Sequence, residues 1–322
     1  MLGVARSEGI EAGEQVRIDS TVTETHILLP EDSRLLVDGV RVLTRLLRQA
    51  RAHLGPEVTF CDHSRACRRR AQEVRSRRGA ERRAQTYRRL LRLVAKTVGY
   101  AEAAKPQVAA VDAAWARSWE RAVVHYGELI ERVVDQTRRR VIQGETVPAK
   151  EKVVSLFEPH TDVIRKGGRT TYYDHKVNLA TGKSGLVLDV VVEEGSPADS
   201  ERCLPMLNRH VAHYGSAPER AAFDGGYASK SNLAEAKSLG VLDVAFHKKS
   251  GLKASEMTRA SWVYAQLRRF RAGIEAGISY LKRCFGLARC NWQDLSHFRA
   301  YVHSAVVAHN LLRIARLQPG PT

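Results

Sequence analysis

The stretch Val16-Arg17-Ile18-Asp19-Ser20-Thr21-Val22 decides the fold class. Apolar and polar residues alternate along it, and Val, Ile and Thr are frequent, which is typical of a β-strand. A strand therefore comes first in the fold, and an acidic residue, Asp19, stands in its middle.

The next segment, residues 33–143, has a helical period instead. Its apolar residues are spaced by fours and threes, as in the series Leu36, Val40, Leu43, Leu47, Ala50 and Leu54. Thirteen Lys or Arg and two Glu lie between Arg65 and Lys96, so this stretch contributes +11 of the net charge of +17. The segment predicts a helical bundle or hairpin with a strongly basic face.

Beyond Pro148 the pattern returns to strands. Two runs rich in Val, Leu and aromatic residues flank the turn 180–185, which predicts a β-hairpin over 172–192. The remaining elements expected in chain order are a strand at 221–224, a helix at 229–239, a strand at 241–246, and helices at 261–285 and 295–317.

This order of elements predicts an α/β protein, with a mixed sheet flanked by helices and a large helical insertion after the first strand. Three segments are expected. Residues 1–30 hold the first strand of the α/β domain, 31–147 the basic helical insertion, and 148–322 the rest of the α/β domain.

Two aspartates occupy costly positions in the predicted strands. Asp19 has Ile18 as its neighbour, and Asp224 ends a strand at the turn Gly225-Gly226. A carboxylate among core residues needs a positive partner, and a divalent cation is one such partner. Ligands of α/β sheets gather beyond the carboxyl ends of strands, where Asp224 is expected.

A third acid follows from helical geometry. Arg268, Arg271, Glu275 and Lys282 share one narrow stripe of the helix predicted over 261–285. The neighbouring stripe is apolar and can pack on the sheet, which would place Glu275 near the aspartates with basic groups on either side. The apolar stripe consists of Phe270, Ile274, Ile278, Leu281 and Phe285.

Plainer interpretations of each feature stay open. Asp19 can be a solvated carboxylate at a strand edge, and Asp224 a turn residue that bonds to its own backbone. Glu275 can simply pair with Arg271 four residues earlier. The run from Arg65 to Lys96 can be a solvated helix face. The combination and order of these features favour the functional interpretation.

The amino-acid composition limits the kinds of partner and the location that we expect for this protein. A pI near 10 favours nucleic acid, and no apolar run approaches the roughly 20 residues that span a bilayer. The first 14 residues do not resemble a signal peptide, so a cytoplasmic location is expected. Five cysteines without Cys-x-x-Cys spacing predict reduced structural thiols and no zinc site: Cys61, Cys67, Cys203, Cys284 and Cys290.

At these residues the sequence resembles DDE transposases of bacterial insertion sequences, in the insertion-sequence-four and -five superfamily and most closely its ISNCY-like members. The first two motifs of that family resemble Arg17-Ile18-Asp19-Ser20-Thr21 and Phe223-Asp224-Gly225-Gly226-Tyr227. Arg271, Glu275 and Lys282 match the R, E and K of the family's Y-(2)-R-(3)-E-(6)-K signature. His309-Asn310-Leu311 resembles its C-terminal end.

Two departures from the family pattern stand out. Arg268 occupies the tyrosine position of the signature, although Tyr264 lies one turn earlier. Only 18 residues precede Asp19, too few for the N-terminal helical DNA-recognition domain that such transposases usually carry. The expectation is a truncated or fragmentary reading frame.

The resemblance implies an RNase H-like catalytic domain that cuts transposon ends and joins them to target DNA. Asp19, Asp224 and Glu275 would be the catalytic and metal-binding residues, holding two Mg²⁺ or Mn²⁺ ions. Double-stranded DNA is the implied partner, a homodimer is left open, and the protein would be associated with the bacterial nucleoid. The DNA-binding residues implied are Arg271, Lys282, Arg268, Arg68, Arg69 and Arg70.

Two other functions remain as alternatives. One is an RNase H-like nuclease that cuts without joining, which product analysis would distinguish. The other is an inactive truncated transposase that only binds DNA, whose signature would be binding without Mg²⁺-dependent nicking.

Overall fold

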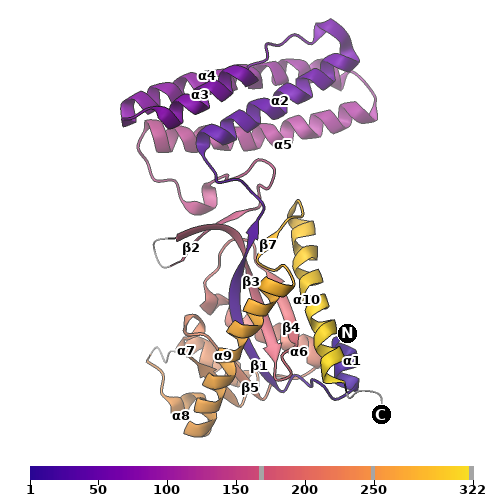
Figure 1. Cartoon of the computed structure of the whole chain (residues 1–322), viewed down its shortest axis with the longest axis vertical. Coiled ribbons are helices and arrows are strands. Elements are labelled where there is room, and N and C mark those ends of the chain that lie inside the picture. The colour runs from indigo at the N-terminus through magenta and orange to yellow at the C-terminus, as the bar shows by residue number, and fades with distance from the viewer. Residues whose placement is uncertain (167–169, 248–250, 319–322) are drawn as a thin grey trace. The chain divides into compact units, whose positions relative to one another are not determined.

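The computed structural model describes residues 1–166, 170–247 and 251–318. The chain divides into two compact units. The sheet unit consists of residues 1–26 and 164–322, and the helical unit of residues 27–163 (Figure 1). Each unit has its own hydrophobic core, and all three predicted acidic residues lie in the sheet unit.

Within the described residues the sheet unit contains one seven-stranded mixed sheet with the order β2-β3-β1-β5-β6, in which β4 pairs with β3 and β7 with β1. β1 is antiparallel to β3 and parallel to β5. This confirms the expected α/β fold class. The strands are β1 (Gln15–Thr25), β2 (Asp162–Lys166), β3 (Thr170–Gly182), β4 (Val187–Val192), β5 (Arg220–Phe223), β6 (Asp243–Phe246) and β7 (Arg289–Cys290).

Helices cover both faces of this sheet. Side chains alternate along β1, so Ile18 faces one side and Asp19 the other. Ile18 packs in a core with α6, whereas the Asp19 side carries α9 and α10. The helices of this unit are α1 (Leu2–Ser7), α6 (Cys203–Tyr214), α7 (Lys230–Ser238), α8 (Ala254–Met257), α9 (Ser261–Cys284) and α10 (Leu295–Leu317).

Most predicted elements of the sheet unit match their ranges, but the turn of one hairpin differs, and the short elements α1, β2, α8 and β7 were not predicted. The turn of the β3–β4 hairpin is shorter than the predicted 180–185, because Ala180, Thr181 and Gly182 continue β3 and pair with β1. Helix α6 was not predicted. It connects β4 to β5 and buries Met206 and Leu207 under the sheet.

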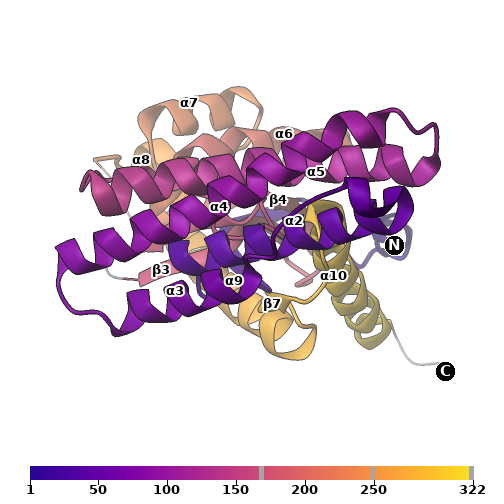
Figure 2. The ribbon, with the colours of Figure 1, turned by 90° about the horizontal axis from the view of Figure 1, so that it is seen from above.

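The helical unit packs four helices around a separate core, and Figure 2 shows α2, α4 and α5 running alongside one another. Buried Trp119 of α5 donates its indole N–H to the carbonyl of Leu46 in α2 at 2.7 Å. The predicted helical insertion is therefore present. Its helices are α2 (Asp32–Leu54), α3 (Ser64–Ser76), α4 (Ala80–Ala109) and α5 (Ala114–Thr137).

The second boundary between the units falls after residue 163, whereas 147 was expected. The intervening segment is tied to the helices, because buried Gln136 of α5 bonds to both the N–H and the carbonyl of Val153. Val153 and Leu156 are also buried in the helical core. None of the helices among the described residues is long and apolar enough to cross a membrane.

The cysteines form no disulfide within the described residues. Cys67, Cys203 and Cys290 are buried, and burial raises the pKa of the Cys67 and Cys203 thiols to about 12. These three fit the prediction of structural thiols. Cys61 and Cys284 are exposed, so that part of the prediction is wrong for them.

Candidate active site

Asp19 is held inside the sheet unit by its position on β1. Asp19 is only 8% exposed, so it is not the solvated carboxylate at a strand edge that the sequence left open. Burial raises the pKa of Asp19, an effect opposed by the backbone N–H of Ser20 and by the charge of Arg271. The Ser20 N–H donates to Oδ1 at 2.8 Å, so this carboxylate has a fixed orientation.

Asp224 follows β5, and the strand register brings it beside Asp19. Ile18 of β1 pairs with Phe223 of the parallel strand β5, so the next residues of the two strands are Asp19 and Asp224. Asp199 approaches the backbone just after Asp224, since a Cβ at Gly226 would lie 2.8 Å from Oδ2 of Asp199. A larger residue at this position would force the Asp199 side chain to shift.

Arg271 and Glu275 come from α9, which crosses the sheet on the Asp19 side. The Nη2 atom of Arg271 lies 3.0 Å from Oδ2 of Asp19 and 3.2 Å from Oδ1 of Asp224. Its Nη1 atom donates to Oε1 of Glu275 at 2.9 Å. One guanidinium thus touches all three predicted acids. The plain pairing of Glu275 with Arg271 is present, but it is one of three contacts.

Arg17 fixes the position of α9 over β1. Its Nη1 donates to the carbonyl of Phe270 at 2.7 Å, and its Nε donates to Oγ1 of Thr181 at 2.8 Å. Gly273 makes room for this contact, because a Cβ there would lie 2.2 Å from Arg17 Nη1. The close packing of helix on strand brings Arg271 within reach of Asp19.

Tyr264 provides a second anchor for α9. It is buried, and its hydroxyl donates to the carbonyl of Phe246 in β6 at 3.0 Å. Its role is therefore to hold the helix to the sheet.

His309 and Asn310 are likewise buried in α10, where Asn310 bonds to both backbone groups of Val187 in β4. These contacts give Asn310 a structural role, which is to join α10 to the sheet.

The carboxylates suit a divalent cation in chemistry, although Arg271 now holds them. Oxygen donors are what Mg²⁺ and Mn²⁺ prefer, and the side chains of Asp224 and Glu275 are 39% and 66% exposed, so solvent reaches them. In the present arrangement no group of three or more His, Cys, Asp or Glu side chains in the described part of the chain could hold a metal ion. The three carboxylates therefore offer the type of donor that such a cation binds, and Arg271 contacts all three of them.

The predicted basic residues of α9 differ in how far they are exposed to solvent. Arg271 is only 7% exposed and is turned toward the carboxylates, unlike the expected contact with a phosphate. Arg268 is exposed one turn earlier, and Lys282 is half-buried two turns beyond Glu275. A helical wheel gives the direction of a side chain around the helix, but not how deeply the neighbouring sheet buries it.

Sequence reasoning missed Asp199 and Lys176, which lie next to the site. Oδ1 of Asp199 accepts from the hydroxyl of Ser20 at 3.0 Å and pairs with Lys176 Nζ at 2.5 Å. Asp199 also raises the pKa of Asp19, though less than burial does. No local pattern marks these residues, because tertiary folding alone joins the loop after β4 to β1 and β3.

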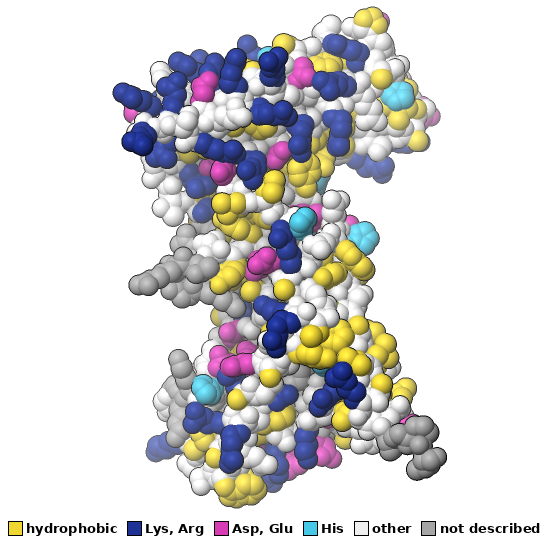
Figure 3. Space-filling model, viewed as in Figure 1, with side chains coloured by type: hydrophobic (Ala, Val, Ile, Leu, Met, Phe, Trp, Pro, Cys, Tyr) yellow, Lys and Arg dark blue, Asp and Glu magenta, His cyan; other side chains and the backbone are white. Residues whose placement is uncertain are grey.

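Arg68, Arg69 and Arg70 lie on α3 of the helical unit. Arg70 is bound to Glu73 at 2.6 Å, whereas Arg68 and Arg69 are exposed and form no ion pair with any described residue. Figure 3 shows many Lys and Arg side chains over these helices. Ten of the thirteen basic residues between 65 and 96 are exposed without an ion pair in the described structure: Arg65, Arg68, Arg69, Arg77, Arg78, Arg82, Arg83, Arg89, Arg92 and Lys96.

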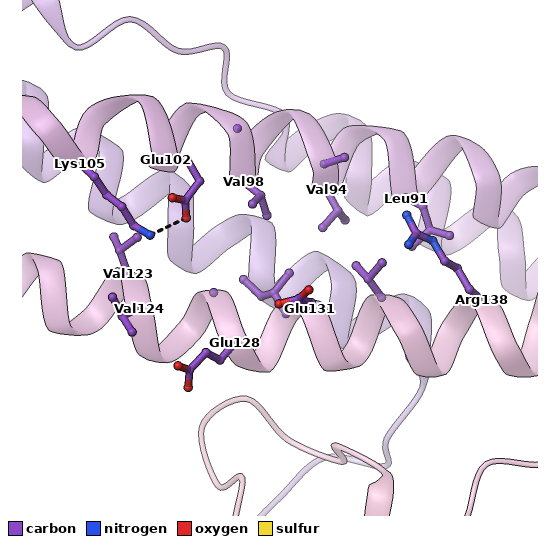
Figure 4. A pocket seen from close by; sticks show the side chains of 15 residues that line it. Leu91, Val94, Val98, Glu102, Lys105, Val123, Val124, Glu128, Glu131 and Arg138 are labelled. Atoms are coloured by element: carbon purple, nitrogen blue, oxygen red, sulfur yellow. Dashed lines mark ion pairs between the residues drawn. The ribbon is translucent and has the colours of Figure 1, made fainter.

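The helical unit also has a groove of about 640 Å³ between α4 and α5 (Figure 4). Its lining is mainly apolar, with Val94, Val98 and Val123 among the residues that face it, and an ion pair joins Lys105 to Glu102 on its edge. Asp19, Asp224 and Glu275 do not line this groove, so we place no reaction there.

Comparison with known proteins adds one match. The family model described as "Transposase DDE domain" matches residues 135–311. This range includes Asp224, Arg271 and Glu275 but begins after Asp19. No curated protein and no solved structure matches the chain.

Proposed function

This chain belongs to the transposase DDE-domain family, and we propose that it cuts the ends of an insertion sequence and joins them to target DNA. Asp19, Asp224 and Glu275 are the proposed acidic residues of the active site. The observation that carries this proposal is that three acids from distant parts of the chain meet at one guanidinium.

The three carboxylates would hold two divalent cations, Mg²⁺ or Mn²⁺. When bound, such ions supply activation of a water and stabilisation of the leaving oxygen in an in-line displacement at phosphorus. The protein supplies fixed oxygens. The Ser20 N–H orients the Asp19 carboxylate, and the Arg17 contact with the Phe270 carbonyl holds α9 and its Glu275 over the strand.

The proposed reaction needs no covalent bond to the protein. Water first cuts the transposon end and leaves a 3′-OH, which then attacks the target strand. Two hydroxyls near the acids are already engaged, since Ser20 Oγ donates to Asp199 and the buried Tyr227 hydroxyl donates to Oδ1 of Asn178. Neither group is a proposed nucleophile.

DNA phosphates are the proposed partners of basic residues on α9 and on the helical unit. Arg268 and Lys282 share the stripe of α9 that carries Glu275, and Arg68 and Arg69 belong to the exposed basic face of the helical unit. Phosphate contacts give affinity and little direct sequence information. Arg70 is a weaker candidate because Glu73 already neutralises it. A homodimer stays a prediction.

We also propose that the chain belongs to the insertion-sequence-four and -five group, with ISNCY-like relatives. Support comes from the spacing of Arg271, Glu275 and Lys282. Arg268 replaces the signature tyrosine, and Tyr264 does not substitute for it because its hydroxyl is bound to the sheet. Any DNA contact made by that tyrosine in the group is therefore assigned to another residue here.

The decisive experiment analyses the products made by the purified chain. Labelled duplexes from the DNA flanking its coding sequence are incubated with supercoiled plasmid in Mg²⁺ or in EDTA. Joined products that require Mg²⁺ support a transposase. Cleavage without joining would identify a nuclease, and binding without nicking would identify an inactive DNA-binding protein.

A further inference from the structure

Arg271 occupies an unusual position for a residue expected to bind DNA. Its side chain is 9% exposed, and its two terminal nitrogens contact Asp19, Asp224 and Glu275 at 2.9–3.2 Å. Its Nε atom is buried and has no hydrogen-bond partner among the described residues. The polar contacts of the guanidinium in this part of the chain are therefore those with the three carboxylates.

The carboxylates need such a cation in order to lie close together. Oxygens of Asp19 and Asp224 both lie within 3.2 Å of a single nitrogen. Two carboxylates at such separations repel each other, and the buried one also loses solvation. Removing one partner from a buried charge cluster is strongly destabilising, so Arg271 stabilises the site when no metal is bound.

We propose that Arg271 is the resident counter-ion of the metal-free site and that divalent cations compete with it for the same oxygens. This inference rests on the proposed function, since it takes the three carboxylates as the metal ligands. Metal binding then displaces the guanidinium, and the released cation becomes available to a DNA phosphate.

Two features of the geometry require an exchange. Both oxygens of Asp19 are already engaged, Oδ1 by the Ser20 N–H and Oδ2 by Arg271, so a metal bound through Oδ2 would have to share that oxygen with the guanidinium. A guanidinium and a divalent ion also repel each other at contact distance, so both cannot hold this oxygen together. The exposed sides of Asp224 and Glu275 give the incoming ion access from solvent.

The test uses Mn²⁺ as the probe, with binding to the full chain followed by electron paramagnetic resonance. Arg271→Gln removes the competing charge, so it should bind Mn²⁺ about ten-fold more tightly, equivalent to about 1.4 kcal/mol. Arg269→Gln is the matched control, because Arg269 is exposed on the same helix and contacts no acid of the site. Its Mn²⁺ affinity should equal that of the wild type.

Thermal unfolding gives a readout of the metal-free state. Arg271→Gln should unfold at a lower temperature than the wild type without metal, and saturating Mn²⁺ should raise its Tm by more than it raises the wild-type Tm. Arg271→Lys keeps the positive charge, but a single ammonium group cannot contact all three acids as the guanidinium does. Its Mn²⁺ affinity should therefore lie between those of the wild type and Arg271→Gln. This variant keeps the test open if the glutamine variant folds poorly.

The outcomes separate this proposal from the proposed function. Equal Mn²⁺ affinity in the wild type, Arg271→Lys and Arg271→Gln would overturn the exchange and leave the metal-dependent function standing. Weaker binding in Arg271→Gln would make Arg271 a support for the metal site. If Mn²⁺ binds no variant, and Asp224→Asn changes nothing, both proposals fail.

A DNA-binding measurement tests the release step. At constant ionic strength, Ca²⁺ should increase the affinity of the wild type for a short DNA duplex more than it increases that of Arg271→Gln. An identical increase in both proteins would show that the displaced guanidinium does not reach a phosphate.

Discussion

In the sheet unit the charges around the carboxylates are buried and paired, whereas in the helical unit most arginines of α3 and α4 face solvent without an acid. Arg271 meets three carboxylates and Lys176 meets Asp199. Arg68 and Arg69 meet none within the described structure. Buried charges interact with specific neighbouring groups, whereas exposed charges attract a charged partner through their combined electrostatic potential. The helical unit is therefore expected to contribute DNA affinity without taking part in the reaction, which is assigned to the sheet unit.

The largest effect should come from removing one charge in the sheet unit. Asp19→Asn keeps the side-chain shape but removes the negative charge that would bind a metal. Cleavage should fall by more than about 10³-fold, the scale seen when a residue acts in the chemical step. DNA affinity should change little, because phosphate contacts lie elsewhere. Cleavage at saturating DNA and Kd are measured on the same preparation.

Asp189→Asn is the control for this change, since Asp189 of β4 pairs with Arg209 and contacts none of the proposed catalytic acids. Retained cleavage in Asp19→Asn would remove Asp19 from the proposed site. A large loss of DNA affinity in Asp19→Asn would instead show that chemistry and affinity are not separable.

The next effect concerns the helical unit and the salt dependence of DNA binding. Each neutralised phosphate adds about −0.9 to the slope of log K against log salt. Replacing Arg68 and Arg69 together by Ala should flatten that slope by up to about 1.8, as two phosphate contacts would require. Arg70→Ala should change it less, because Glu73 holds Arg70. An equal effect of all three arginines would show that exposure without an acid partner does not select the phosphate contacts.

Motifs with local signatures could be predicted from the sequence, and these include the principal acids. Asp19 stands out because it lies within a strand pattern, and Asp224 because it follows one at a Gly-Gly turn. Helix α9 was predicted over nearly its full length, because its long apolar stripe repeats every three or four residues. The fold class followed from the order of these elements.

Features created by tertiary contact could not be predicted. The inward turn of Arg271 depends on how closely α9 lies on β1, and that distance is set by Arg17 and Gly273 together. Asp199 and Lys176 carry no motif of their own. Helix α6 was missed because the polar residue His210 interrupts the apolar face that this helix buries.

The packing of α9 can be tested with two glycines of the same helix. Gly273→Ala should destabilise the protein, because the new Cβ would force Arg17 away from the Phe270 carbonyl. The lost bond to a charged donor costs about 1.5–3 kcal/mol, partly offset by a helix-propensity gain of about 1 kcal/mol.

Gly277→Ala is the matched change one turn later, where nothing lies within 4 Å of the new Cβ. It should stabilise the protein by up to about 1 kcal/mol through helix propensity alone. Urea unfolding of both variants gives the two free energies. The same sign for both would mean that Arg17 moves aside at no cost and does not fix α9.

The smallest expected effect compares a buried and an exposed histidine within the sheet unit. Burial lowers the pKa of His210 on α6 below its usual 6.5. The unfolded chain therefore takes up this proton more readily, and the stability associated with neutral His210 is lost as the pH falls below 6.5.

His297 has the opposite sign, because bonds to the Gln293 carbonyl and to Asp294 raise its pKa. Its contribution is present at low pH and is lost as the pH rises through the raised pKa. The two glutamine variants, His210→Gln and His297→Gln, are unfolded in urea at several pH values between 5 and 8. Relative to the wild type, the first should gain stability toward pH 5 and the second should lose it. If the free energies of unfolding of the two variants changed with pH in the same way, burial would not control the charge of His210. The contrast between buried and exposed charges would then not apply to histidine.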